Sequence, residues 1–341
     1  MPHNSVQLRS KAVERNASEF LDYESLLIFN PPANDDIDYL SPAAVITFDY
    51  GAYQYHQRGL EEKVIFSLEH DANELYDAAL IYLPKSKGEL DLVLSYLAPM
   101  MKQGADVFLV GEKKAGIASA AKKLDSLGSN NSKIDSAKHC QLWQVTYSEQ
   151  AMPFLLDDWL ETYQVCIKER EFQVSTIPGV FSFGSLDQGT ELLLNNMFTK
   201  LEGRILDFGC GCGVVGAYTK LLNPSIYLEM IDTNLLALIC AEKTLKLNSI
   251  NGKVYPSDGW TDVQGRVSGI VTNPPFHSGV STEYQTTETF VRKAKDKMSK
   301  HAPLLLVANN FLRYASIIES VFGRSDVLVE NTKFRVYKAF R

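Results

Sequence analysis

The sequence predicts an α/β protein made of two tandem Rossmann-like domains, the first of which is degenerate. Three observations lead to this prediction: a length of 341 residues, a regular alternation of strand-like and helix-like segments in the second half, and a fainter repeat of that alternation in the first half. A chain of this length is too long for one ordinary hydrophobic core and suits two domains. We place the domains at residues 1–160 and 165–341, with the join between residues 148 and 164.

In the second half, short apolar segments alternate with amphipathic helices. Strands are expected at residues 204–207, 226–231, 253–256, 267–272 and 304–308. A helix is expected over residues 234–247, with Asn234 able to cap its start. This order predicts a parallel sheet with crossover helices. A terminal hairpin is expected from residues 326–330 and 333–339.

The first half repeats this pattern more faintly. Strands are expected at residues 25–29, 44–48, 78–82, 105–110 and 141–147, helices at 89–101 and 117–127, and a polar surface loop at 129–132. Asp49 follows its strand as Asp232 follows the corresponding strand of the second half. The first strand, however, runs into Asn30, Pro31 and Pro32 where the second half has glycines. We therefore interpret the first half as the same fold without its site chemistry and without a cofactor.

Composition and charge narrow the class of protein. A hydrophobic content of 45% and a charged content of 22% are typical of globular proteins. No apolar run is long enough to span a membrane, the N-terminus lacks the order of a signal peptide, and the five cysteines show no paired spacing. We therefore expect a cytoplasmic protein that does not bind a membrane. Because the net charge is −7, a nucleic-acid partner would need a local basic patch.

A glycine loop after the strand at 204–207 carries much of the functional signal. Its spaced residues are Asp207, Gly209, Gly211 and Gly213. Glycine lets the backbone approach a ligand closely, and the helix that follows offers free N–H groups at its start. Asp232, at the end of the next strand, can accept hydrogen bonds from both hydroxyls of a ribose. These residues predict a nucleotide-like cofactor, although Gly211, Gly213 and Gly216 also match a dinucleotide fingerprint.

Two further turns complete the predicted site. Asp258 and Gly259 follow the third strand, where Asp258 could accept from the exocyclic amine of adenine or simply form an Asp-Gly turn. The fourth strand is followed by Asn273, Pro274, Pro275 and Phe276. The prolines stiffen the turn and leave the Asn273 side-chain oxygen and the Pro274 carbonyl as two fixed acceptors. Such a pair suits the two hydrogens of an amino group on a planar ring, on which Phe276 can stack.

The sequence indicates no metal site but contains three basic clusters. Cys210 and Cys212 lie in the glycine loop, yet zinc needs about four ligands at ligand-like spacing, which the other cysteines do not provide. The basic clusters are Lys85, Lys87, Lys113 and Lys114 at first-half strand ends; Arg292, Lys293, Lys295, Lys297 and Lys300 on one helix, with an apolar stripe of Val291, Ala294 and Met298; and Lys333, Arg335, Lys338 and Arg341 near the C-terminus. We favour the first-half cluster for contact with phosphates.

Taken together, the motifs of the second half resemble those of a known family. The glycine loop, Asp232 and residues 273–276 resemble class I S-adenosylmethionine-dependent methyltransferases that act on amino groups. A longer pattern, formed by residues 178–182, 186–190 and 273–277, is similar to the small-subunit ribosomal RNA guanine-N2 methyltransferase C family. The resemblance implies two class I methyltransferase domains and transfer of a methyl group from S-adenosyl-L-methionine, without a metal, to N2 of a guanine in 16S rRNA of the small ribosomal subunit, by family guanine 1207.

The resemblance also implies roles for individual residues. Phe181, Asp187 and Gly189 would line the cofactor pocket ahead of the glycine loop, residues 273–276 would be catalytic, and Asn273 would also face the cofactor. The degenerate first domain would serve stability or RNA docking, and we expect a monomer. The motifs leave three alternatives open: methylation of another amine, such as adenine N6 or a protein glutamine; an NAD-dependent oxidoreductase; and a non-catalytic RNA-binding protein.

Overall fold

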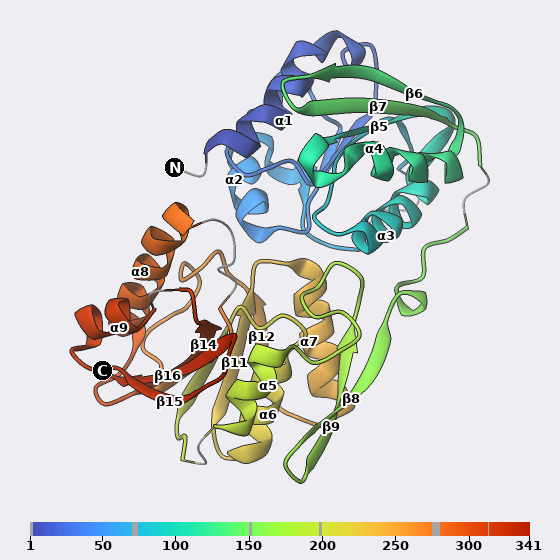
Figure 1. Ribbon diagram of the computed structural model, residues 1–341. Coiled ribbons are helices and arrows are strands. Elements are labelled where there is room, and N and C mark those ends of the chain that lie inside the picture. Colours follow the sequence, from blue (N-terminus) through green and yellow to red (C-terminus); the bar gives the residue numbers. More distant parts are fainter. Residues whose placement is uncertain (1–2, 70–73, 150–151, 198–199, 275–279, 313) are drawn as a thin grey trace. The chain divides into compact units, whose positions relative to one another are not determined.

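The chain folds into two compact units, Met1–Trp159 and Leu160–Arg341. The computed structural model describes residues 3–69, 74–149, 152–197, 200–274, 280–312 and 314–341 (Figure 1). Each unit contains one seven-stranded sheet with helices packed against it. The predicted pair of tandem α/β domains is therefore confirmed.

The N-terminal unit is built on a sheet of order β3-β2-β1-β4-β5-β7-β6. Its strands are β1 (Leu26–Phe29), β2 (Ala44–Ile46), β3 (Val64–Ile65), β4 (Tyr76–Tyr82), β5 (Met101–Glu112), β6 (Gly128–Ala137) and β7 (Cys140–Tyr147), and its α-helices are α1 (His3–Arg15), α2 (Tyr50–Leu60), α3 (Lys87–Leu97) and α4 (Ile117–Ala120). Strands β1 to β5 run parallel, whereas β7 is antiparallel to its neighbours β5 and β6. Ala12 and Val13 of α1 pack with Ile28, Leu80 and Phe108 on one face of this sheet.

The C-terminal unit repeats this topology, with strand order β12-β11-β10-β13-β14-β16-β15. Its strands are β10 (Arg204–Phe208), β11 (Tyr227–Asp232), β12 (Lys253–Pro256), β13 (Gly269–Thr272), β14 (Pro303–Asn309), β15 (Asp326–Glu330) and β16 (Phe334–Phe340), and its helices are α5 (Gln188–Asn195), α6 (Val214–Leu222), α7 (Leu235–Leu247), α8 (Val280–Lys297) and α9 (Tyr314–Phe322). Helices α5 to α7 lie on one face of the sheet and α8 and α9 on the other (Figure 1). The parallel sheet, the terminal hairpin and the repeat between the halves are thus confirmed.

A two-stranded hairpin, β8 (Glu161–Ile167) and β9 (Arg170–Thr176), precedes the C-terminal sheet. The backbone N–H of Ser175 donates to Thr244 Oγ1 of α7 at 3.0 Å, and the N–H of Gln173 donates to Asn248 Oδ1 at 2.9 Å. These bonds attach the hairpin to α7. This hairpin was not predicted from the sequence, although its buried residues alternate: Val165, Ile167, Phe172 and Val174.

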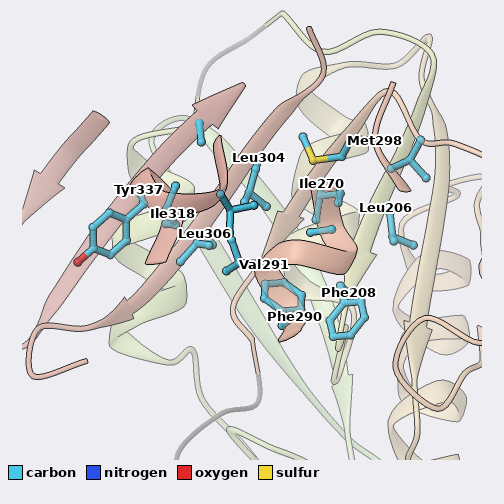
Figure 2. Close-up of a cluster of buried hydrophobic side chains, with 14 of the residues drawn as sticks. Leu206, Phe208, Ile270, Phe290, Val291, Met298, Leu304, Leu306, Ile318 and Tyr337 are labelled. Atoms are coloured by element: carbon cyan, nitrogen blue, oxygen red, sulfur yellow. The ribbon is translucent and has the colours of Figure 1, made fainter. Parts of the chain in front are cut away.

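A hydrophobic core of the C-terminal unit lies between the sheet and helices α8 and α9 (Figure 2). Leu206, Ile270 and Leu304 come from three adjacent strands and meet Val291 of α8 and Met298, the residue that follows this helix. Burial of each side chain of this size contributes roughly 1.5–3 kcal/mol, which holds the strand ends in fixed positions. The apolar stripe predicted for this helix is therefore confirmed.

Two local predictions for the first half are wrong. Residues 129–132, predicted as a surface loop, lie within β6, and residues 117–127, predicted as one helix, form the short α4 followed by a 3₁₀ helix, Ala121–Ser126. Strand β6 lies at the edge of its sheet, and its register with β7 shifts between Ser129 and Ser132. Polar residues are tolerated there because an edge strand is partly solvated.

Candidate active site and cofactor pocket

The predicted site residues gather at one edge of the C-terminal sheet. Strands β10, β11, β12 and β13 are neighbours and run parallel, so their carboxyl ends meet at that edge. There β10 leads into the glycine loop, β11 ends at Asp232, β12 leads into Asp258, and β13 leads into Asn273. The order of the central strands, with β10 between β11 and β13, creates the crevice in which parallel α/β sheets bind ligands.

The glycine loop is held in a conformation that requires glycine. Gly209, Gly211 and Gly213 have φ values of 67°, 51° and 81°, in the left-handed region. A Cβ on Gly213 would lie 2.6 Å from Met230 Cε, whereas a Cβ on Gly211 would meet no atom of the described residues within 4 Å. Gly213 is therefore needed for packing against β11, while Gly211 faces open space in which a ligand can approach the backbone.

Asp232 holds the loop to the neighbouring strand. Its Oδ2 accepts from the backbone N–H of Gly211 at 2.9 Å, and its Oδ1 accepts from the N–H of Asn234 at 2.9 Å. Asn234 in turn caps α7 by accepting from the N–H groups of Leu236 and Ala237, as the sequence predicts. The carboxylate thus belongs to both the loop and the start of the next helix.

Asp207 lies beneath the loop. Its side chain is 2% exposed, and Oδ2 accepts from the N–H of Gly216, in the first turn of α6, at 2.8 Å. Burial raises the pKa of this carboxyl to about 7, the Gly216 hydrogen bond opposes the rise, and the charge of Asp232 adds to it. Asp207 therefore shapes the loop from below.

A cavity of about 570 Å³ lies beside the loop. Its wall contains residues from the ends of β10, β11 and β12 and from α8: Phe208, Gly209, Ile231, Asp232, Thr233, Ser257, Asp258, Gly259, Trp260, Thr261, Thr289, Phe290 and Lys293. Three predicted cofactor residues besides Gly209 are thereby brought together, namely Asp232, Asp258 and Gly259. Acceptors for ribose and amine groups stand beside an apolar wall, so the residues present fit a nucleoside such as that of S-adenosylmethionine.

The apolar wall is a cluster of three aromatic rings, and the sequence patterns connect only one of them, Trp260, with the pocket. The ring of Phe208 lies 4.4 Å from that of Trp260 and 4.9 Å from that of Phe290, between centroids. Figure 2 shows Phe208 and Phe290 side by side. Trp260 follows Asp258 and Gly259, where the sequence places an adenine ring, but Phe290 and Lys293 come from α8, whose pattern predicts only a core stripe and a solvated face.

Asn273 is fixed by the start of α5. Its Nδ2 donates to Asp187 Oδ2 at 3.1 Å and to Thr190 Oγ1 at 2.9 Å. Asp187 is the N-cap of α5 and accepts from the N–H of Thr190 at 2.8 Å through the same oxygen. Pro274 is buried, while Pro275 and Phe276 lie outside the described residues.

The segment before α5 also reaches the glycine loop. Cys212 Sγ lies 3.5 Å from Thr176 Oγ1 and 4.0 Å from the carbonyl oxygen of Phe181. The Phe181 side chain is 55% exposed. Gly189 packs against β16, since a Cβ there would lie 3.0 Å from the ring of Phe334. The structure therefore brings Phe181 to the loop and Asp187 to Asn273.

Comparison with known proteins agrees with this arrangement. The methyltransferase small domain model matches residues 171–338, and its N-terminal companion matches residues 10–163. The ribosomal RNA small subunit methyltransferase C of Aeromonas hydrophila is 38% identical over 332 residues, which cover 96% of each chain. That of Hahella chejuensis is 40% identical over 322 residues, covering 93% of this chain and 94% of the relative. The chain belongs to the ribosomal RNA small subunit methyltransferase C family.

A solved structure supports the methyltransferase C fold over the whole chain. The T. thermophilus 16S rRNA N2 G1207 methyltransferase (RsmC), solved in complex with AdoMet and guanosine, has a TM-score of 0.82 and 20% sequence identity. The match covers 100% of this chain and 92% of that chain. Both sheets, and not only the one that carries the glycine loop, therefore belong to the family's architecture.

The structure also bears on three other features: metal-binding groups, the two cysteines of the glycine loop and membrane-spanning helices. Among the described residues, no group of three or more His, Cys, Asp or Glu side chains could hold a metal ion. Cys210 and Cys212 are buried free thiols, and burial raises the pKa of Cys210 well above its usual value. Within the described part of the chain, no helix combines the length and apolar character needed to cross a membrane.

The three basic clusters differ in how much of their charge is free for a partner. On α8, Arg292 pairs with Glu288, and the ammonium groups of Lys295 and Lys297 donate to the backbone carbonyls of Val321 and Val263. At the C-terminus, Arg335 pairs with Glu330 and Arg341 donates to the carbonyl of Met298. In the N-terminal cluster, Lys85, Lys87, Lys113 and Lys114 are all exposed, although Lys114 lies 3.1 Å from Glu112.

Proposed function

We propose that this protein transfers a methyl group from S-adenosyl-L-methionine to the exocyclic N2 of a guanine in 16S rRNA. The observation that carries the proposal is the pairing of β10 with β13, which puts the glycine loop and Asn273 at one edge of one sheet. The glycine loop and the fixed Asn273 amide thereby follow two neighbouring strands. The T. thermophilus relative is named for the guanine G1207, and we propose the equivalent nucleotide as the target here.

Specific residues are proposed to hold the cofactor. The backbone of Gly209, Gly211 and Gly213 would approach it closely, and the Asp232 carboxylate would accept from ribose hydroxyls. Asp258 and Gly259 would meet the adenine ring against the aromatic wall. Asp207 would act through the shape of the loop, and Phe181, Asp187 and Gly189 would border the methyl-donor end.

Rate enhancement would come from orientation of the amine. S-adenosylmethionine would supply an electrophilic methyl carbon, so the protein needs neither a metal nor a covalent intermediate. The bond between this carbon and sulfur would break as the bond to N2 forms, S-adenosylhomocysteine would leave, and the nitrogen would release one proton to solvent. The Asn273 side-chain oxygen and the Pro274 carbonyl would accept the two hydrogens of the guanine amino group and aim the nitrogen at that carbon. Pro275 and Phe276 are proposed to stiffen the turn and to stack on the base.

The N-terminal unit is proposed to bind RNA phosphates and no cofactor. After β1, the Asn30 side chain accepts from the N–H of Phe48 at 2.7 Å, and the buried His56 ring lies 3.1 Å from the Pro32 carbonyl oxygen. In the N-terminal unit, side chains and backbone groups therefore bond to one another at the position where the C-terminal unit has its glycine loop. With its exposed lysines, this unit suits RNA docking in a monomeric, cytoplasmic enzyme.

The experiment is methylation of small-subunit ribosomal RNA with isotopically labelled S-adenosylmethionine, followed by mass spectrometry of the nucleosides. N2-methylguanosine is the expected product, whereas N6-methyladenosine or labelled protein glutamine would support methylation of another amine. Calorimetry with S-adenosylhomocysteine and with NAD tests the oxidoreductase alternative, since only the former is expected to bind. An Asn273→Ala protein that keeps full activity would contradict the proposed site.

A further inference from the structure

We propose that Asp187 and Thr190 are positioning residues that fix the orientation of the Asn273 amide for the incoming amine. The inference rests on the proposed function and adds to it two residues and a reason for their spacing. It starts from the two hydrogen bonds that Asn273 Nδ2 donates, one to Asp187 Oδ2 at 3.1 Å and one to Thr190 Oγ1 at 2.9 Å.

An unrestrained asparagine is ambiguous toward an amine. Its terminal amide can rotate by half a turn, and it then presents NH₂ donors in place of the oxygen. An amino group also presents hydrogens, so the wrong orientation sets donors against donors. Only the orientation with Oδ1 toward the amine can accept its hydrogen, and selection between the two orientations therefore affects every turnover.

The start of α5 selects one orientation. A carboxylate accepts hydrogen bonds and donates none, so Asp187 can receive only the NH₂ side of the Asn273 amide. The two hydrogens of that NH₂ group are matched by two acceptors, Asp187 Oδ2 and Thr190 Oγ1. Because the nitrogen is committed to α5, the oxygen is the polar atom of the amide that can meet a substrate.

Asp187 and Thr190, which together form a clamp on the Asn273 amide, are themselves held in place. Asp187 Oδ2 also accepts from the N–H of Thr190 at 2.8 Å, so Asp187, Thr190 and Asn273 form a closed cycle of hydrogen bonds. Thr190 is 5% exposed. Gly189 keeps the space beside this cycle, since a Cβ there would lie 3.1 Å from Asp187 Oδ2 and 3.0 Å from the Phe334 ring. The pattern Asp-x-Gly-Thr at residues 187–190 thus has one explanation. Asp187 caps α5, Gly189 leaves space beside the cap, and Thr190 supplies the second acceptor for Asn273.

The decisive variant is Thr190→Val, which removes the Oγ1 acceptor and keeps the shape of the side chain and the backbone N–H that bonds to Asp187. One Asn273 hydrogen then has no acceptor on α5, and the amide is held by the Asp187 bond alone, which lets it move away from the orientation that suits the amine. We expect kcat to fall roughly 10- to 100-fold, as for a misplaced reacting group, with little change in the affinity for S-adenosylhomocysteine. Thr190→Ser restores a hydroxyl at the same position and should recover most of the rate.

A matched control is Thr219→Val on α6. Thr219 is also buried, and its hydroxyl donates to the Val215 carbonyl of its own helix at 2.7 Å. This change removes a buried hydroxyl of the same kind without altering the bonds to Asn273. We expect kcat per folded molecule to stay within about twofold of the wild type, with the folded fraction at the assay temperature taken from the thermal unfolding curve. A fall as large as that of Thr190→Val would show that loss of any buried hydroxyl is enough, and would overturn the inference.

Two further measurements separate positioning from a general structural role. In an Asn273→Ala background, Thr190→Val should cause no additional loss of rate, because the group that it positions is gone. In the protein without cofactor, labelling of asparagine with ¹⁵N should show the two Asn273 side-chain hydrogens, and Thr190→Val should shift them while Thr219→Val leaves them unchanged.

The outcomes also separate this inference from the proposed function. If the wild-type protein forms no N2-methylguanosine, the proposed function fails, and the side-chain resonances alone test the clamp. If the wild-type protein is active, the inference is overturned by a Thr190→Val protein with wild-type kcat, by a Thr190→Ser protein as slow as Thr190→Val, or by an undiminished effect of Thr190→Val in the Asn273→Ala background.

Discussion

The backbone N–H of Gly211 donates to Oδ2 of Asp232 across 2.9 Å, so the carboxylate at the end of β11 restrains the loop that follows β10. The residue expected to bind ribose is therefore also the residue that shapes the loop. A change at this position should weaken cofactor binding through loss of the ribose contact and through loss of the loop bond. It should leave the packing of the hydrophobic core unchanged.

Asp232→Asn tests this relationship. The amide keeps one acceptor oxygen but cannot accept at both positions, so the loop bond, the Asn234 bond or a ribose bond is lost. We expect S-adenosylhomocysteine to bind about 10- to 100-fold more weakly, which corresponds to roughly 1.5–3 kcal/mol for a hydrogen bond to a charged group. Titration calorimetry measures this affinity. Asp49→Asn changes the residue that follows the equivalent strand of the N-terminal unit, and it should leave the affinity unaltered.

The buried carboxyl of Asp207 should make stability depend on pH. Its folded-state pKa is raised to about 7, above the ordinary value of 3.8, so between these values the folded state binds more protons than the unfolded state. Stability contributed by this group is therefore complete below pH 4 and is lost as the pH rises toward 7. Asp207→Asn, which keeps an acceptor for Gly216, should gain in Tm relative to the wild type between pH 5 and pH 8. Thermal unfolding without cofactor measures this, and parallel Tm curves for the two proteins would contradict it.

Phe311 is expected to contact the RNA substrate near the site. It is 69% exposed on a turn at the carboxyl end of β14, the neighbour of β13, and the turn is braced by an Asn310 Nδ2 bond to the Asn331 carbonyl at 2.5 Å. An exposed aromatic ring on a fixed turn is typical of base-stacking surfaces, which contribute roughly 1–3 kcal/mol per base. Phe311→Ala should raise the KM for RNA, and Phe311→Trp should not. Tyr227→Ala, at the opposite end of the sheet and 76% exposed, is the control and should leave KM unchanged.

Reversal of charge at Lys113 and Lys114 should weaken RNA binding and reduce its dependence on salt. Both side chains are exposed at the carboxyl end of β5, and each lysine that neutralises a phosphate changes the slope of log affinity against log salt by about 0.7–0.9. Filter binding at several salt concentrations measures the slope. Reversal at Lys11 and Lys122, exposed elsewhere on the same unit, matches the change in net charge. Equal slopes for the two double variants would exclude a specific role for the first pair.

The parts of the fold that sequence analysis predicted are those with local signals. Apolar strands followed by Asp232, Asp258 and Asn273 are visible along the chain, because each strand and its terminal polar residue are adjacent in sequence. The hairpin β8–β9 was not predicted, and residues 129–132 of β6 were predicted as a loop, because these segments are polar on the solvated side and depend on pairing with another strand.

The site was predictable only as far as its motifs reach. The partners of Asn273 lie 86 and 83 residues away along the chain, so no spacing rule connects Asp187 or Thr190 to its amide. Phe290 and Lys293 reach the pocket from a helix whose sequence indicates only a buried stripe and a charged face. Such contacts follow from the packing of α5 and α8 on opposite faces of the sheet, which a pattern of residues does not specify.

The most direct test is to methylate small-subunit ribosomal RNA with the wild-type and Asn273→Ala proteins, after calorimetry has established that both bind S-adenosylhomocysteine. We predict that the wild type forms N2-methylguanosine at one guanine and that Asn273→Ala, assayed with S-adenosylmethionine at saturation, forms at least about 100-fold less per unit time. Equal yields of N2-methylguanosine from the two proteins, or none from a wild type that binds the cofactor, would contradict the account.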